Sequence, residues 1–487
     1  MAILSEVHAT LAFFLSGAFK KIFPDNLLVI EHSFGDAFFC HDVDYEPISA
    51  DDLIKLEKLM NEWINSDKPV EFERWDKNRF IEKLYKYNSK SKLAIADKWE
   101  ENTIPIAKYN KVYWDYIIDP LIADKSKLKN FELKKYNDGF LLRFATELHP
   151  EELLPFVDQP KLFATMEEHL KWSGILGIAT IGDLNNAIKN DEIKELMWVA
   201  EGLHEKKISD IADEIVANFP AKRIITIAGP SSAGKTTFSK RLKIQLRVNG
   251  FRSHTISMDD YFIDRDLLPV GKDGKKDFES IEGLDVILLG KRLNALIEGK
   301  AIPERKFDFD IGKGRDLRTK LQLGEWDFII IEGIHGLNPK LTEQFGDDRV
   351  EKLYVSAITQ MNIDANHRIS TSDNRLLRRL VRDSKFRGYS PEQTLERWPS
   401  VRQGEERNIF PFSEEANFIF NSSLVYEFSV LAKYVRPLLK NVKANGQTTK
   451  LANRLDLFLS FFTDISEKYV PGTSLLREYI GNSDFKY

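Results

Sequence analysis

The chain has 487 residues, 43% hydrophobic and 30% charged, and 75 acidic against 70 basic residues give a net charge of −5. This composition is typical of a globular protein with a large core, and it argues against wholesale coating of nucleic acid or adsorption to an anionic membrane. A single cysteine, Cys40, excludes an intramolecular disulfide and a cysteine-rich zinc module, and no apolar run is long enough for a membrane span, so we expect a cytoplasmic protein.

The first predicted unit, residues 1–200, is an α+β domain with its connector. Its apolar stretch 10–19 could be mistaken for a signal peptide, but it lacks a cationic start and predicts an amphipathic helix. Strand-like segments at 27–30 and 37–41 follow. A helix from Ser49 to about residue 66 begins with a capping serine and acids in its first turn. A helical pattern over 191–218 ends before Pro220, and residues 201–220 are predicted to link to the next domain.

The second predicted unit, residues 221–440, is an α/β domain with a doubly wound parallel sheet. Short apolar strands alternate there with helix-length segments, which is typical of parallel sheets. The predicted strands are 223–228, 252–257, 326–331, 351–355 and 417–421. Residues 441–487 are expected to form a helical tail whose leucines pack on another part of the chain.

A glycine-rich loop carries the strongest chemical signal in the sequence. Gly-Pro-Ser-Ser-Ala-Gly-Lys-Thr at 229–236 follows a predicted strand and precedes a helix that Gly250 ends, as a P-loop that wraps nucleotide phosphates requires. A structural glycine-rich turn is the alternative, and the flanking elements argue against it. The predicted ATP-binding residues of this loop are Gly229, Pro230, Ser231, Ser232, Ala233, Gly234, Lys235, Thr236 and Thr237.

Carboxylates follow two further predicted strands of this sheet. Glu332 ends the strand at 326–331, and with the hydroxyl of Thr236 it is a candidate Mg²⁺ neighbour. Asp259 and Asp260 end the strand at 252–257, where a carboxylate could accept the proton of an attacking hydroxyl. A surface glutamate and a solvated acidic turn are the alternative interpretations.

A strongly basic segment lies further along the chain. On a helix, Arg375, Arg378, Arg379 and Arg382 fall on one side at steps of three or four residues, and Arg387 follows. Such a face is often only solvated, but phosphoryl transfer needs cations that close over the transferring group. We therefore interpret the segment as a lid.

These motifs, in this order, resemble the uridine kinase/phosphoribulokinase family over roughly residues 221–435. The motifs are the P-loop, Ile-Ser-Met-Asp-Asp-Tyr-Phe at 256–262, Glu-Gly-Ile-His-Gly-Leu-Asn-Pro at 332–339 and the arginine pattern at 378–388. The resemblance implies an ATP- and Mg²⁺-dependent kinase. It places Asp259 as the catalytic base that also neighbours the metal, Lys235 and Arg382 as catalytic groups, and Arg379 and Arg387 as phosphate-holding lid residues.

The nucleoside pocket implied by the resemblance departs from the family pattern. Glu279 stands where uridine kinases hold the ribose with an aspartate, and Phe307 replaces a tyrosine. Phe262 also replaces a tyrosine, Gly312 stands where a base-contacting histidine is expected, and Phe309 keeps the aromatic ring. The predicted substrate contacts are Asp259, Glu279, Phe307, Phe309 and Arg379.

Residues 8–82 resemble the second accessory domain of threonyl-tRNA synthetases, which some bacterial uridine kinase-like proteins join to a kinase. In the synthetases this domain hydrolyses mischarged tRNA with His-x₃-His and Cys-x₃-His pairs. Here His8 keeps one position, whereas Ala12, Ile117 and Leu121 replace the other three. We therefore expect a non-hydrolytic domain, with Cys40 and the nearby histidines structural.

Taken together, the sequence predicts an ATP-dependent kinase of a small-molecule alcohol, with a uridine- or cytidine-like nucleoside as the first candidate. No membrane or nucleic-acid partner is expected, and assembly into a homo-oligomer is left open. Two alternatives remain: an RNA-associated or ATP-sensing regulator with weak or no kinase activity, and a catalytically silent nucleotide-binding scaffold. Retention of Asp259, Glu332 and the lid arginines argues against the scaffold.

Overall fold

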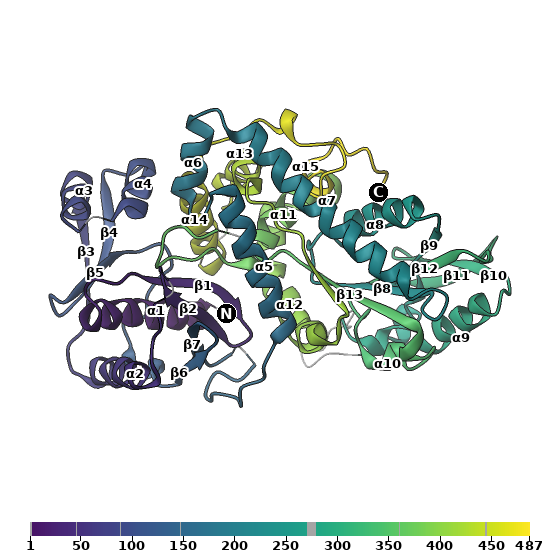
Figure 1. The fold of residues 1–487 in the computed structure, drawn as a ribbon, viewed down its shortest axis with the longest axis horizontal. Coiled ribbons are helices and arrows are strands. Elements are labelled where there is room, and N and C mark those ends of the chain that lie inside the picture. The colour runs from purple at the N-terminus through teal and green to yellow at the C-terminus, as the bar shows by residue number, and fades with distance from the viewer. Residues whose placement is uncertain are drawn as a thin grey trace.

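The computed structural model describes residues 2–44, 46–87, 89–146, 148–269, 279–359, 361–443 and 446–487. Two antiparallel sheets lie in the N-terminal part of the chain and a parallel sheet lies in the C-terminal part, with helices packed between them (Figure 1). This arrangement confirms the predicted α/β domain preceded by an α+β domain.

The N-terminal unit consists of one sheet of order β1-β2-β7-β6, a second of order β3-β4-β5, and four helices. Helices α1 and α2 bury their apolar sides with the first sheet, where Leu11, Phe14 and Leu56 are fully buried. Ser49 caps α2 and exchanges hydrogen bonds with Asp52, as its sequence predicts. The bounds are α1 (Ala2–Ile22), β1 (Leu28–Phe34), β2 (Ala37–Asp42), α2 (Ala50–Asn65), β3 (Val70–Asp76), α3 (Lys77–Lys86), α4 (Lys90–Lys98), β4 (Thr103–Tyr109), β5 (Tyr113–Tyr116), β6 (Phe131–Tyr136) and β7 (Gly139–Phe144).

Three helices connect this unit to the parallel sheet: α5 (Pro160–Leu176), α6 (Ile181–Lys189) and α7 (Ile193–Ala217). The second half of α7 buries Ile208, Ile211 and Ile215 in the same cluster as Phe238 and Leu242 of the helix after the P-loop. The end of the predicted connector is therefore packed on the C-terminal domain, while the predicted domain boundaries themselves stay predictions.

The parallel sheet contains all five predicted strands in the order β14-β13-β8-β12-β9. Its central strands are buried apolar runs, which is typical of a sheet covered by helices on both faces. The bounds are β8 (Ile224–Ala228), α8 (Lys235–Val248), β9 (Arg252–Ser257), α9 (Val286–Ile297), β12 (Asp327–Glu332), α10 (Pro339–Thr342), β13 (Val350–Ser356), α11 (Thr371–Phe386), α12 (Pro391–Asn408), β14 (Phe418–Asn421) and α13 (Glu427–Lys440).

Two features differ from the sequence prediction. An antiparallel hairpin of β10 (Ile302–Asp308) and β11 (Lys313–Leu321) lies between α9 and β12, where no strands were predicted. The predicted helical tail is helical only in part, with α14 (Gln447–Ser460) and the short α15 (Arg477–Ile480) separated by mostly irregular chain. Irregular chain can be buried there because its backbone groups find partners, among them Ile465 N–H, which donates to the Ser429 carbonyl.

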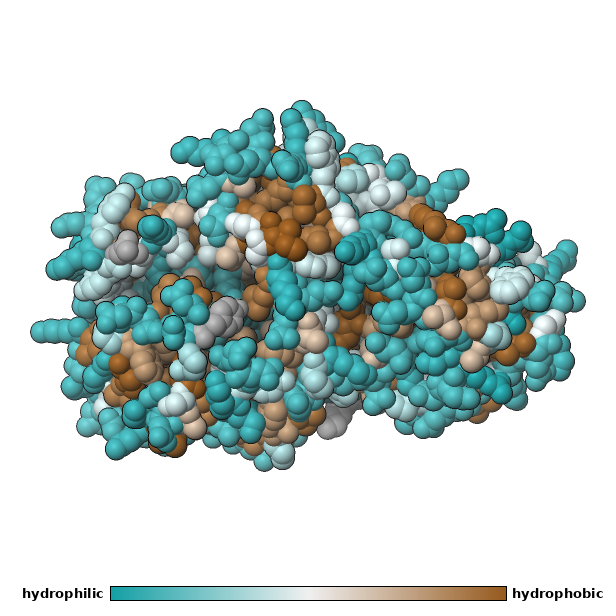
Figure 2. Space-filling model, in the orientation of Figure 1, coloured by the Kyte–Doolittle hydropathy of each residue, from teal (hydrophilic) through white to brown (hydrophobic). Residues whose placement is uncertain are grey.

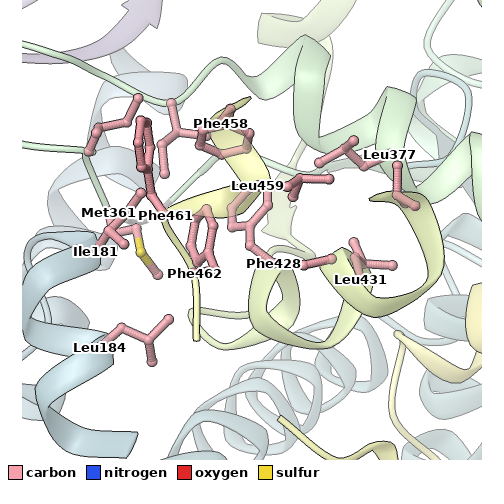
Figure 3. Close-up of a cluster of buried hydrophobic side chains, with 14 of the residues drawn as sticks. Ile181, Leu184, Met361, Leu377, Phe428, Leu431, Phe458, Leu459, Phe461 and Phe462 are labelled. Atoms are coloured by element: carbon pink, nitrogen blue, oxygen red, sulfur yellow. The ribbon is translucent and has the colours of Figure 1, made fainter. Parts of the chain in front are cut away.

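One large hydrophobic core joins the two halves of the molecule. Side chains of α6, α11, α13 and α14 meet around the Phe458, Phe461 and Phe462 rings (Figure 3). The segment between β13 and α11 adds a polar anchor, because the buried carboxylate of Asp364 accepts a hydrogen bond from the Tyr116 hydroxyl of β5 at 2.5 Å. The tail leucines therefore pack on a shared core, as their spacing predicted.

On the face drawn in Figure 2, hydrophilic side chains separate hydrophobic patches of limited size. Among the residues that the structure describes, no helix is long and apolar enough to cross a membrane.

Candidate active site

The glycine-rich loop between β8 and α8 turns its carbonyl groups toward protein donors. Lys235 Nζ donates to the Gly229 carbonyl at 2.8 Å and to the Pro230 carbonyl at 3.3 Å. Arg375 reaches the Ser231 carbonyl at 3.1 Å, and Tyr479 donates its hydroxyl proton to the Ser232 carbonyl at 3.0 Å. The carbonyl oxygens of the loop are thus engaged by protein donors. The loop leads into the first turn of α8, whose backbone N–H groups have no partner within the helix and can bind a phosphate.

Two glycines of the motif are required by local geometry. Gly234 has φ +87, a left-handed conformation that side chains other than glycine adopt at a cost. A Cβ atom on Gly229 would lie 2.1 Å from the Val355 carbonyl oxygen, so only glycine lets the loop pass this close to β13. The motif therefore has the conformation that its sequence predicted.

Thr236 and Glu332 lie together at the carboxyl edge of the sheet. Glu332 ends β12 in register with Ile227 of β8, directly beside the loop. The Thr236 hydroxyl donates to Glu332 Oε1 at 2.6 Å. Burial raises the pKa of Glu332, whereas this hydrogen bond and the charge of Lys235 oppose the rise. The sequence thus correctly placed a hydroxyl and a carboxylate side by side at the loop.

Asp259 lies near the same edge, in the 3₁₀ turn Met258–Tyr261 that follows β9. The last residue of β9, Ser257, pairs with Glu332, which places the turn next to the end of β12. The contact is tight, since a Cβ atom on Gly333 would lie 2.5 Å from Met258 Sδ. Burial raises the pKa of Asp259, and the charges of Lys235 and Arg387 act on it in the opposite direction. Asp259 is therefore a partly desolvated carboxyl group on a solvent-accessible residue, and the charges of the loop lysine and a lid arginine act on it.

The neighbouring carboxylate, Asp260, is held by the β10–β11 hairpin instead. Its Oδ2 accepts from Lys306 Nζ at 2.7 Å, and its Oδ1 accepts from the Phe307 backbone N–H at 3.4 Å. The two adjacent carboxylates thus have different surroundings. The charge of Lys235 acts on Asp259, whereas Asp260 is hydrogen-bonded to the hairpin.

Arg375 and Arg378 of α11 are buried in ion pairs, whereas the sequence analysis placed both on the face of a lid. Arg375 is fully buried and forms a bidentate pair with Glu405 of α12, at 2.5 and 2.8 Å. Arg378 is fully buried against Glu427 of α13 at 2.7 Å and also donates to the Ser422 carbonyl at 2.8 Å. Both guanidinium groups also donate hydrogen bonds to carbonyl oxygens of the loop, and these bonds stabilise the conformation of the loop.

The Arg378–Glu427 pair gives a stability prediction. Replacement Glu427→Ala leaves a buried guanidinium without its counter-charge, so we expect the free energy of unfolding to fall by about 3–5 kcal/mol. Denaturant unfolding followed by circular dichroism measures this change. The control Glu298→Ala removes an exposed carboxylate paired with Lys300 and should leave the midpoint unchanged. Equal midpoints for the two variants would contradict the structural role of the pair.

The remaining lid arginines converge on one buried carboxylate, Asp383. Arg379, Arg382 and Arg387 lie 3.2, 3.4 and 3.8 Å from it. Arg379 also donates to the Ser231 hydroxyl at 2.8 Å, which links it to the loop. The charge of Arg382 contributes to lowering the pKa of Lys235, although burial is the main cause. These three cations therefore lie together around Asp383, with half of the Arg387 side chain exposed, and their role as a lid stays a prediction.

Three aromatic side chains that the sequence analysis assigned to the acceptor site lie together at the hairpin. The rings of Phe262, Phe307 and Phe309 pack with centroids 5.1–6.2 Å apart; Phe307 is buried and Phe309 is half-exposed. Gly312 has φ +77, and a Cβ atom there would lie 2.7 Å from Arg265 Cβ, so a histidine does not fit this hairpin.

Glu279 lies beside the lid helices. A Cβ atom on Gly404 of α12 would lie 3.0 Å from Glu279 Cγ, and the charge of Glu279 acts on the pKa of Arg379. Residues 270–278, which precede Glu279 in the predicted ribose motif, lie outside the described part of the chain.

In the N-terminal unit, His8 is a packed side chain. Its ring stacks on Phe144 with centroids 3.7 Å apart, its Nε2 is 3.0 Å from the Ala145 carbonyl oxygen, and burial lowers its pKa to about 4. Ala12, Ile117 and Leu121 all pack against the core that α1 shares with its sheet. Among the described residues, no group of three or more His, Cys, Asp or Glu side chains could hold a metal ion.

Some side chains at the loop were not predicted from the sequence. Glu405 accepts a hydrogen bond from the Ser231 N–H at 2.9 Å, and Glu478 accepts from the Thr237 hydroxyl at 2.6 Å. Both follow the loop by more than 170 residues, and no spacing pattern connects them to it.

The fold and the loop define a P-loop nucleotide-binding domain. Residues 224–427 match the model of the Phosphoribulokinase / Uridine kinase family. Uridine kinases of Staphylococcus aureus strains JH9 and Newman are each 29% identical over 200 residues, 41% of this chain and 87% of theirs. The C-terminal domain is therefore similar to the phosphoribulokinase/uridine kinase family, and this similarity supports ATP-dependent kinase activity on a small molecule.

Solved structures with a similar domain include a "Possible Uridine Kinase" from Bacillus stearothermophilus, 20% identical with a TM-score of 0.30, covering 44% of this chain and 98% of that one. A D-glycerate 3-kinase from Cryptococcus neoformans is 13% identical with a TM-score of 0.22, covering 56% of this chain and 86% of that one.

Proposed function

We propose that this protein transfers the γ-phosphate of ATP to a hydroxyl group of a nucleoside, with uridine or cytidine as the first candidates. The observation that carries the proposal is the position of Asp259, a solvent-accessible carboxyl group under the electrostatic influence of Lys235, at the sheet edge that holds the P-loop. The similarity to uridine kinases supports a nucleoside as the acceptor.

Each proposed role follows from the chemistry of the side chain. Lys235 and backbone amides of the loop and the first turn of α8 would bind the phosphates of ATP, because they combine a point charge with the N-terminus of α8. The acceptor oxygen would attack the γ-phosphorus while its proton passes to the Asp259 carboxylate and ADP leaves. Arg379, Arg382 and Arg387 would compensate the negative charge that spreads over the transferring group.

Mg²⁺ fits the donor set at the loop. The ion usually takes one or two protein oxygens together with substrate phosphates, and Thr236 and Glu332 supply a hydroxyl and a carboxylate already 2.6 Å apart. Asp259 would lie close enough to assist through its charge. When bound, Mg²⁺ would neutralise charge between the phosphates.

The test is a panel of ribonucleosides, deoxynucleosides and sugars incubated with ATP and Mg²⁺, scored by ADP release and by mass of the phosphorylated product. We expect a ribonucleoside to give the highest kcat/KM, with a product heavier by one phosphoryl group. Phe262 and Phe307 lack hydroxyl groups for hydrogen bonds to the acceptor, so discrimination among bases should be weak, within about tenfold. Preference for a non-nucleoside alcohol would overturn the acceptor assignment and leave the kinase assignment intact.

A further inference from the structure

The C-terminal end of the chain returns to the P-loop. The chain terminus lies next to α8 (Figure 1). A Cβ atom on Gly234 would lie only 2.9 Å from Leu475 Cδ2 and 3.6 Å from the Tyr479 hydroxyl oxygen. The segment 475–487, which we call the C-terminal strap, is therefore in van der Waals contact with the loop itself.

The strap places a carboxylate on the first turn of α8. Glu478 Oε2 accepts hydrogen bonds from the Thr237 hydroxyl at 2.6 Å and from the Thr237 backbone N–H at 3.3 Å. The hydroxyl of Tyr487 lies 2.7 Å from the same threonine hydroxyl, and Lys240 Nζ donates to the Lys486 carbonyl. Backbone and hydroxyl groups at this position of a P-loop are donors to nucleotide phosphate. A protein anion thus occupies a place that the loop offers to a phosphate.

The strap is held there by buried contacts. Leu475, Leu476 and Tyr479 are fully buried, and the Tyr479 ring lies 5.3 Å from the Arg378 guanidinium. Lys385 of α11 donates to the Ile480 carbonyl at 2.7 Å, so the strap also joins the lid helix to the loop. The position of Glu478 follows from this packing and is not that of a free chain end.

We propose that the C-terminal strap is a built-in competitor of the nucleotide. The carboxylate of Glu478 and a nucleotide phosphate cannot both accept the Thr237 N–H and hydroxyl hydrogens, and two anions at that distance repel each other. A nucleotide therefore binds fully only after Glu478 leaves Thr237. Its apparent affinity is the intrinsic affinity multiplied by the fraction of molecules in which the strap has left Thr237, as for any site that is only partly available.

Isothermal titration of the full chain with ATP, without an acceptor, tests this inference. Glu478→Gln removes the charge and weakens the hydrogen bonds to Thr237, so we expect its dissociation constant for ATP to be about tenfold lower than that of the unmodified chain. The matched control is Glu467→Gln, a change in the same C-terminal region at a carboxylate paired with Lys433, which should leave ATP affinity unchanged. Unchanged or weaker ATP binding by Glu478→Gln overturns the inference.

A tighter affinity of Glu478→Gln for ATP could also come from the loss of a negative charge alone. Hydrogen exchange of the unmodified chain tests directly whether the strap moves when ATP binds. The amides of Tyr479, Ile480 and Gly481 bond to carbonyls within the strap, and these amides should exchange faster when ATP is added to the unmodified chain. Equal or greater protection with ATP bound means that the strap stays in place, and the inference fails.

The inference rests on the proposed function only in taking Thr237 as part of a nucleotide site. If the unmodified chain, Glu478→Gln and Glu467→Gln all fail to bind ATP, the nucleotide site and the strap inference fall together. If ATP binds without displacing the strap, only the strap inference falls.

Discussion

Replacement of Asp259 by asparagine is expected to lower kcat by about 10³-fold and to change the dissociation constant for ATP by less than about threefold. An asparagine of the same shape cannot accept the proton of the attacking hydroxyl, whereas the phosphates are held by other groups. Steady-state kinetics with the best acceptor of the panel, together with titration of ATP, measures both effects.

The matched control for this prediction is the adjacent carboxylate. Asp260→Asn changes a side chain that pairs with Lys306 of the hairpin, so we expect it to keep kcat within about tenfold while raising the acceptor KM. If Asp260→Asn abolishes turnover and Asp259→Asn does not, the base assignment is reversed.

We expect Asp259→Asn to lower the activity of the protein without lowering its stability. Burial raises the pKa of Asp259 above its unfolded value, so this group favours folding at low pH and that contribution is lost as pH rises through the folded pKa. Asparagine carries no charge, and Asp259→Asn should therefore be at least as stable as the unmodified chain at neutral pH. A lower thermal midpoint for this variant would mean that its loss of turnover reports unfolding. The raised pKa also implies that, as the pH is lowered, kcat/KM begins to fall at a higher pH than it would with an aspartate of ordinary pKa.

Replacement of Lys235 by alanine is expected to impair both binding and turnover, with ATP bound about tenfold more weakly and kcat reduced by about 10²–10³-fold. The ammonium group is the cation built into the loop, where it bonds to the Gly229 and Pro230 carbonyls. Its loss removes positive charge from the phosphates and two hydrogen bonds that shape the loop. ATP titration and single-turnover rates separate the two effects.

Lys243→Ala is the control for Lys235. This lysine lies two turns further along α8 and approaches the Thr255 hydroxyl at 3.4 Å, so its removal should alter neither ATP affinity nor turnover. ATP binding by Lys235→Ala that equals that of the unmodified chain would contradict the assignment of the loop as a phosphate site.

Local patterns predicted much of the fold. The five strands of the parallel sheet, the P-loop and the capped helix α2 depend on short-range rules: apolar β-branched runs, glycines at close approaches and a serine with its acidic partner three residues on. The hairpin β10–β11 was missed because its strands are mostly exposed and charged, as in Lys313–Leu321, and therefore lack an apolar pattern.

The candidate site was predicted as a set of residue types but not as a set of contacts. Residue spacing alone did not distinguish Asp259 from Asp260, and only the family resemblance favoured Asp259. In the structure the hairpin binds Asp260, and the charge of Lys235 acts on Asp259. It also put Arg375 on the lid face, although this side chain is buried against Glu405. The identity of a pairing partner depends on which helices pack together.

The sequence by itself determined the class of chemistry, because the P-loop and each strand that ends in a carboxylate are motifs of a few consecutive residues. Only the tertiary structure decided which charges are free and which are paired, since an ion pair depends on distance in space. The contact between Thr237 and Glu478, 241 residues apart, is the clearest instance: no local pattern encodes it, and it exists because buried side chains of the tail bring the end of the chain back to the loop.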